Sequence, residues 1–197
     1  KTFRDAEEYM NNPYLIDDIS KKSIQEIKES LSFLKKLSKR IECYDISNIS
    51  GKEAVGSMVV AIDGKIEKSE YKRFRIKFKQ KPDDFGMMYE VLSRRLSREL
   101  SKKKEKSWGL PDLIIVDGGK PQVSAGEEVM KDLGIDVSLV GIAKRYETLV
   151  YKEDGDFVEK KLPEDNLGMR LIISLRDESH RFAQSYHHLL RKKSLIK

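Results

Sequence analysis

The spacing of hydrophobic residues along the chain changes from a helical period to that of strands. Ser23 can cap a helix in which apolar residues recur every three or four positions. Those residues are Ile24, Ile27, Leu31 and Leu34. The segments 41–46 and 55–62 predict two short strands, and Asp63 and Gly64 predict a tight turn into a third strand over 65–78. The chain therefore opens with an amphipathic helix and a meander of three antiparallel strands.

Helices and strands alternate in the second half of the chain. Asp83 or Asp84 can cap a long helix with an apolar stripe. The continuously apolar run 113–116 predicts a central strand that is covered on both faces, and this strand ends on Asp117. The remaining elements are a helix from near Pro121 to Gly134, a strand over 138–143, a hairpin within 149–161 and a helix over about 166–193.

This order of elements predicts a single mixed sheet. A meander followed by right-handed strand–helix–strand crossovers places helices on both faces of the same sheet. The succession fits an α/β fold of the ribonuclease H-like type, with a mixed five-stranded sheet and a small extra hairpin. In that arrangement the first and fourth strands are parallel neighbours, so Asp45 and Asp117 can meet. We predict a helical lead-in over 1–38 and a ribonuclease H-like domain over 39–197.

Composition narrows the class of protein. The 197 residues include 39 Lys and Arg against 33 Asp and Glu, giving a formal net charge of +6. This balance suits a polyanionic partner, although solvated helix faces also produce it. No apolar run approaches the ~20 residues that cross a bilayer, so we expect a cytoplasmic protein with no membrane span. Cys43 is the single cysteine, which excludes a disulfide or a cysteine-based zinc site within this chain. Because the chain begins with Lys, we expect other modules to flank it.

Three residues are candidates for a metal site. Asp fits poorly inside a strand, so Asp45 indicates either a metal ligand or a cap for the bend at Ser47. Asp117 closes an apolar strand at the edge where α/β sheets bind ligands, although it could instead cap the next helix. Two close carboxylates repel unless a cation neutralises them, which predicts a Mg²⁺ or Mn²⁺ site. His180 could supply a third ligand, although a lone helical histidine is more often a surface residue.

Basic residues provide candidate contacts for a phosphate backbone. They are Arg94, Arg95, Arg98, Lys120 and Lys144. Lys120 follows two glycines at the start of a predicted helix, where backbone N–H groups and the positive helix end attract anions. The spacing of a nucleotide P-loop is absent. The structural alternative for these residues is an ordinary solvated surface.

Six motifs occur in the order found in the UvrC family, the nuclease subunits of bacterial nucleotide excision repair. They begin at Glu42 (ECYDISN), Tyr71 (YKRF), Asp83 (DDF, leading to SRR), Ile115 (IVDGGK), Gly141 (GIAK) and Arg176 (RDESHRFA). Over about 40–193 the chain resembles the carboxy-terminal endonuclease domain of this family. The order and number of the motifs make a chance resemblance improbable.

The resemblance implies a function and a set of site residues. It implies an excision nuclease that uses Mg²⁺ or Mn²⁺ and incises damaged double-stranded DNA on the 5′ side of the lesion. The Asp-Asp-His triad of the family maps onto Asp45, Asp117 and His180. The full-length protein would act with a UvrB-type partner, and a separate amino-terminal domain would make the 3′ incision.

Two alternatives stay open from the residues. The first is a non-catalytic DNA-binding or docking domain in which the two aspartates cap turns. The second is a recombinase-type nuclease of the ribonuclease H fold. Such sites generally use a third carboxylate where this chain offers His180, and Asp177 or Glu178 would then be the next candidate.

Overall fold

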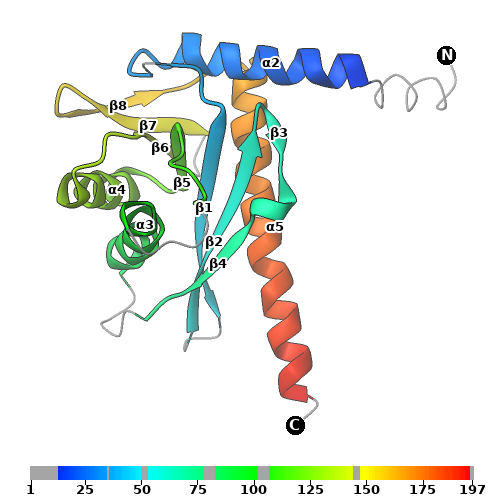
Figure 1. The fold of residues 1–197 in the computed structure, drawn as a ribbon, viewed down its shortest axis with the longest axis vertical. Coiled ribbons are helices and arrows are strands. Elements are labelled where there is room, and N and C mark those ends of the chain that lie inside the picture. The colour runs from blue at the N-terminus through cyan, green and yellow to red at the C-terminus, as the bar shows by residue number, and fades with distance from the viewer. Residues whose placement is uncertain are drawn as a thin grey trace, which may run out of the picture.

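Helices cover both faces of a central sheet in the computed structural model (Figure 1). The structure describes residues 13–34, 36–49, 53–77, 83–101, 107–143 and 147–195, with side chains up to residue 185 in the last helix. Helix α5 (Leu167–Leu195) runs along one face and extends past the sheet, and α2 (Pro13–Ser30) crosses one end. Helices α3 (Asp84–Leu100) and α4 (Lys120–Leu133) pack side by side on the opposite face.

The described strands form one eight-stranded mixed sheet. They are β1 (Arg40–Ile49), β2 (Glu53–Ile62), β3 (Lys65–Ile66), β4 (Lys72–Arg75), β5 (Leu113–Asp117), β6 (Ser138–Ala143), β7 (Thr148–Glu153) and β8 (Asp156–Lys160). The order is β3-β2-β1-β5-β6-β7-β8, with β4 also paired to β2. Strands β1, β5 and β6 are parallel neighbours, and the other pairs are antiparallel. The predicted ribonuclease H-like α/β fold is confirmed, and the hairpin β7–β8 extends its sheet.

Two local predictions differ from the structure. The third strand is interrupted by a short 3-10 helix, η1 (Lys68–Glu70), because the Glu67 carboxylate accepts a hydrogen bond from the backbone N–H of Ser69 and caps this turn. Ser23 does not cap a helix. Helix α2 already begins at Pro13, a residue suited to a first helical turn, and the buried Ser23 hydroxyl donates to the Ile19 carbonyl.

Strand alternation divides the buried side chains into two layers. One layer contains Ile41, Cys43, Leu113 and Ile115 and packs against α2 and α5. The other contains Tyr44, Val60, Ile114 and Val116 and packs against α3 and α4. Because side chains alternate along a strand, Asp45 and Asp117 continue the first layer and face α5. The topology therefore directs both carboxylates toward the last helix.

The end of α2 belongs to the same buried layer. Ile27 and the residue Leu31 just beyond the helix are both fully buried against the sheet and α5. The Glu26 carboxylate also accepts a hydrogen bond of 2.6 Å from the backbone N–H of Leu167 at the start of α5. The domain boundary after residue 38 stays a prediction. Among the described residues, none of the helices combines the length and the apolar character that a membrane span requires.

Candidate metal centre

Asp45, Asp117 and His180 converge from three separate elements. The parallel pairing of β1 with β5 sets Tyr44 opposite Val116, so the next aspartate along each strand meets the other, as the topology predicted. His180 reaches them from α5. Its Nδ1 lies 3.3 Å from Asp45 Oδ2, and its Nε2 lies 2.9 Å from Asp117 Oδ2. One ligand atom from each residue lies within 4.8 Å of the others, so a single cation could contact all three after a small adjustment.

The surroundings of these residues favour a cation. Both aspartates are buried, whereas the His180 side chain is 40% exposed. The Ser47 hydroxyl donates a 2.8 Å hydrogen bond to Asp45 Oδ2, but a neutral hydroxyl leaves the negative charge of the pair uncompensated. Two carboxylates with one imidazole form a donor set that Mg²⁺ or Mn²⁺ accepts. The residues present therefore fit a divalent metal ion.

A cleft of about 400 Å³ opens beside the two aspartates. Asp84 from the first turn of α3 and Gln122 from α4 also line it, together with Gly118 and Gly119. From the sequence Asp84 was a candidate only for a helix cap, and the cap is in fact Asp83, which accepts a hydrogen bond from the Phe85 N–H at 3.1 Å. Only one of these two adjacent aspartates is needed to cap the helix. The presence of the second was the signal that could have identified Asp84 as a residue of the site.

The loop after β5 depends on a close backbone approach. Gly141 on β6 lies against this loop, and a Cβ atom added there would come within 2.5 Å of the Gly118 carbonyl oxygen. The Gly118 N–H donates to the Ile142 carbonyl at 3.0 Å. A side chain at Gly141 would push the loop away from the sheet, so glycine here keeps the rim of the cleft next to Asp117.

Cys43 takes no part in this chemistry. It lies two residues before Asp45 on the same face of β1 and is fully buried. Burial raises the pKa of the Cys43 thiol, which keeps it protonated at neutral pH. Its sulfur lies 3.9 Å from the Ser179 hydroxyl and packs β1 against α5.

The expected DNA contacts occupy different environments. The Arg94 side chain is 42% exposed, donates to the Arg75 carbonyl at 2.7 Å and pairs with Glu90. Arg98 is half-buried with its guanidinium carbon 4.3 Å from the centre of the Trp108 ring. Lys120 is exposed and forms a 2.8 Å ion pair with Glu159. Lys144 lies outside the described residues.

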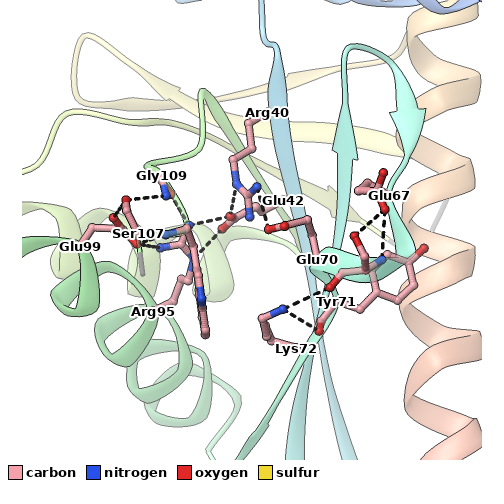
Figure 2. A network of polar contacts seen from close by, with 12 residues as sticks. Arg40, Glu42, Glu67, Glu70, Tyr71, Lys72, Arg95, Glu99, Ser107 and Gly109 are labelled. Carbon is pink, nitrogen blue, oxygen red and sulfur yellow. Dashed lines mark hydrogen bonds and ion pairs between the residues drawn. The ribbon is translucent and has the colours of Figure 1, made fainter. Parts of the chain in front are cut away.

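The expectation that Arg95 contacts DNA is wrong, because its side chain is fully buried. It donates to both carboxylate oxygens of Glu42, at 2.7 and 3.1 Å, and to the Gly109 carbonyl (Figure 2). Arg40 contacts Glu42 from the other side. The signal was present in the spacing, since Arg95 follows Val91 by four residues and Leu92 by three and so falls on the buried stripe of α3.

The last helix separates the two acidic residues that were the alternative ligands. Asp177 is exposed and pairs with Arg176 at 2.8 Å. Glu178 points to the other flank of α5, where it accepts a hydrogen bond from the Tyr71 hydroxyl at 3.0 Å and pairs with Arg181. Among the described residues, the group of possible ligands is Asp45, Asp117 and His180.

The fold and the acidic cleft define a nuclease domain of the ribonuclease H-like class. Residues 29–184 match the family model of the UvrC RNAse H endonuclease domain, and the chain belongs to this family. The resemblance found in the motifs is thereby confirmed. A family of this description favours a nuclease over a docking domain and over a recombinase.

Curated relatives agree with this assignment. The chain is 40% identical over 195 residues to the UvrABC system protein C of Fusobacterium nucleatum, covering 98% of this chain and 31% of that protein. It is 38% identical over 192 residues to the protein of the same name from Thermotoga petrophila, covering 98% and 32%. The chain therefore spans about a third of the length of these relatives. The crystal structure of human ENDOV aligns with a TM-score of 0.44 at 11% identity, covering 76% of this chain and 86% of that one.

Proposed function

We propose that this chain hydrolyses a phosphodiester bond of damaged double-stranded DNA on the 5′ side of a lesion, as the metal-dependent endonuclease domain of an excision-repair protein. One observation carries the proposal: two buried carboxylates that line an open cleft meet an imidazole, in a domain that belongs to the UvrC endonuclease family. Mg²⁺ and Mn²⁺ both suit this donor set.

Each residue has a distinct part in the proposed reaction. Asp45 and Asp117 would hold the cation and are fixed by neighbouring strands, so they need little reorganisation. His180, whose side chain is 40% exposed and lies 2.9 Å from Asp117, would supply the third ligand. A bound divalent ion supplies Lewis acidity, which activates water and stabilises charge on the phosphate and on the leaving 3′ oxygen.

The rim of the cleft can receive the phosphate backbone. The amino-terminal end of α4 lies at Gly118, Gly119 and Lys120, and helix N-termini attract anions. The ion pair of Lys120 with Glu159 is exposed on both sides, and such pairs contribute about 0–1 kcal/mol. A DNA phosphate could therefore replace Glu159 as the partner of Lys120 at little cost.

The proposed partners follow from the same function. Damaged DNA would be the substrate, and a UvrB-type protein would bind through other parts of the full-length protein. Action on chromosomal DNA in a bacterial cell implies a cytoplasmic location.

One observation favours a second candidate, a non-catalytic DNA-binding or docking domain. Each ring nitrogen of His180 lies close to one of the two carboxylates, at 3.3 and 2.9 Å, so the three side chains could hold one another in place as a structural network without a metal. A titration of the chain with Mn²⁺ separates the two candidates. Binding is measured as the decrease in the electron paramagnetic resonance signal of the free ion. Binding that Asp45→Asn and Asp117→Asn both abolish, together with nicking of lesion-containing plasmid, supports the endonuclease. The same titration curve for all three proteins supports the docking domain.

Replacement of His180 tests the third ligand. We expect His180→Ala to lower nicking by about 10²-fold, because the cation keeps two of its three protein ligands. His180→Asp should recover part of the activity and shift the preference from Mn²⁺ toward Mg²⁺, because an oxygen ligand replaces nitrogen. Initial rates measured with each metal check both expectations. Parental rates for a folded His180→Ala protein would assign the third ligand to another residue.

The basic surface of α3 predicts a salt-dependent contribution to DNA affinity. We expect binding by the isolated chain to weaken steeply with salt, with a slope of log K against log[salt] of roughly 0.9 per phosphate contacted. Arg94→Ala should reduce that slope by about one such contact, because its side chain is exposed on α3. Fluorescence anisotropy at several salt concentrations measures the slope. An unchanged slope would place Arg94 outside the DNA interface.

A further inference from the structure

The position of His180 depends on the backbone of α5 more than on packing of the imidazole itself. Its side chain is 40% exposed, and its contacts at the site are with the two carboxylates it would share with a cation. The position of the imidazole therefore follows the position of the helix turn that carries His180. The carboxyl-terminal part of α5 also extends past the sheet, beyond the helices that cover the opposite face (Figure 1).

Strand β4 and the residue before it contact one flank of this helix turn. The Tyr71 hydroxyl donates to Glu178 Oε1 at 3.0 Å, and the Tyr71 ring meets the Phe182 ring edge-on at 5.1 Å between centroids. The Arg73 guanidinium stacks on Phe182 at 3.9 Å. It also donates to the Phe182 carbonyl at 3.2 Å and to the Ser185 hydroxyl at 2.8 Å. We call Tyr71 and Arg73 the β4 clamp.

The residues that the β4 clamp holds form one stripe of α5. Glu178, Phe182 and Ser185 follow one another at spacings of four and three, so they share a face of the helix. His180 follows Glu178 by two residues, which places it about 200° further round the helix axis. The clamp and the metal site therefore lie on opposite flanks of α5, and the buried Ser179 lies between these flanks, on the side that faces the sheet.

Contacts under the helix complete this arrangement. Ser179 is fully buried, and its carbonyl accepts a hydrogen bond of 3.2 Å from the Ser57 hydroxyl on β2. The Cys43 sulfur, 3.9 Å from the Ser179 hydroxyl, also contacts this sheet-facing side of the turn. The β4 clamp adds contacts on the flank, where they resist a rotation of the turn about the helix axis. A turn of about 10° would move a side chain at a radius of about 6 Å by about 1 Å. That displacement exceeds the roughly 0.2 Å tolerance of a metal–ligand bond.

We propose that Tyr71 and Arg73 are positioning residues that set the rotation of α5 and thereby place His180 on the metal site. The inference rests on the proposed function, because it concerns the third ligand of the cation. It adds two residues on the far flank of the helix that act through His180 without touching the metal, the water or the phosphate.

The test is Mn²⁺ affinity, measured on the whole chain by electron paramagnetic resonance. Tyr71→Phe keeps the ring on Phe182 and removes only the bond to Glu178, and we expect the dissociation constant to rise about fivefold. Tyr89→Phe is the matched control. It removes an equivalent bond, from the Tyr89 hydroxyl to Asp132 at 2.7 Å, between α3 and α4, and should leave the Mn²⁺ dissociation constant unchanged. Arg73→Lys loses the planar stacked guanidinium and provides a second variant with the same expected direction.

A double-mutant cycle identifies the route of the effect. In a His180→Ala background, Tyr71→Phe and Arg73→Lys should change Mn²⁺ affinity no further, because the ligand they position is gone. An equal loss of affinity with and without His180 would overturn the clamp, as would wild-type affinity in both single variants. If Asp45→Asn leaves Mn²⁺ binding unchanged, the proposed metal site is wrong, and the role of the clamp is wrong with it. If Asp45→Asn abolishes Mn²⁺ binding but the clamp variants bind Mn²⁺ like the parent, only the clamp is wrong.

Discussion

Asp117→Asn is expected to abolish metal-dependent nicking, lowering the rate by about 10³-fold while the domain stays folded. Asparagine retains the size of aspartate, so the buried end of β5 keeps its packing. It removes the charge that would hold the cation, together with the repulsion that Asp117 shares with Asp45. The fraction of lesion-containing plasmid nicked at saturating Mn²⁺ measures the activity, and a thermal melt measures the fold.

Asp132→Asn is the matched control for this result. Asp132 is an aspartate of α4 that accepts a hydrogen bond from Tyr89 and does not line the cleft. Its replacement should leave the nicking rate within about twofold of the parent, since surface changes away from such sites alter stability by about 0.5 kcal/mol or less. A folded Asp117→Asn protein that nicks at the rate of this control would place the active site elsewhere.

Arg95→Met is expected to destabilise the domain by about 3 to 5 kcal/mol, because it leaves the Glu42 carboxylate buried with one partner removed. Arg40, which also contacts Glu42 at 2.8 Å, keeps the expected loss near the lower end of that range. The Tyr44 hydroxyl, 2.6 Å from the same carboxylate, loses the guanidinium beside it as well. For a domain of this size the melting temperature should fall by about 6 to 12 °C. Thermal and urea unfolding measure the change.

Two further variants distinguish a buried ion pair from a DNA contact. Arg94→Met changes an exposed neighbour on the same helix and should alter stability by about 0.5 kcal/mol or less. The double variant Glu42→Gln with Arg95→Met removes both charges, so it should be more stable than Arg95→Met alone. Equal, small effects at Arg94 and Arg95 would contradict the buried pair that the structure shows.

The sequence pattern was most informative where a local rule decides the structure. Asp83 caps α3, Gly134 ends α4 with a positive φ of 64°, and the apolar run that ends on Asp117 is a central strand, as predicted. These features depend on hydrogen bonds and backbone angles within a few residues. The interruption at η1 was missed because a single capping carboxylate, Glu67, outweighed a strand-like alternation.

Charge along a helix gave a poorer prediction of function. Arg94 and Arg95 are adjacent and chemically identical, yet one is exposed and the other is fully buried against Glu42. Composition cannot separate them, because the partner of Arg95 lies 53 residues away in the chain. Only the position of each residue relative to the buried stripe of α3 carried that information.

The order of elements, the family motifs and the pairing of the two strands that carry Asp45 and Asp117 could all be predicted from the amino-acid sequence. This follows because hydrophobic period, turn residues and the handedness of crossovers are local or topological rules. Three features are visible only in the folded chain: His180 reaches both carboxylates, Asp84 lines the cleft beside them, and Tyr71 and Arg73 contact the far flank of α5. These are distances between side chains on separate elements. They depend on the positions of the helices on the sheet. Those positions are set by the packing of the whole core, and no short segment of the sequence encodes them.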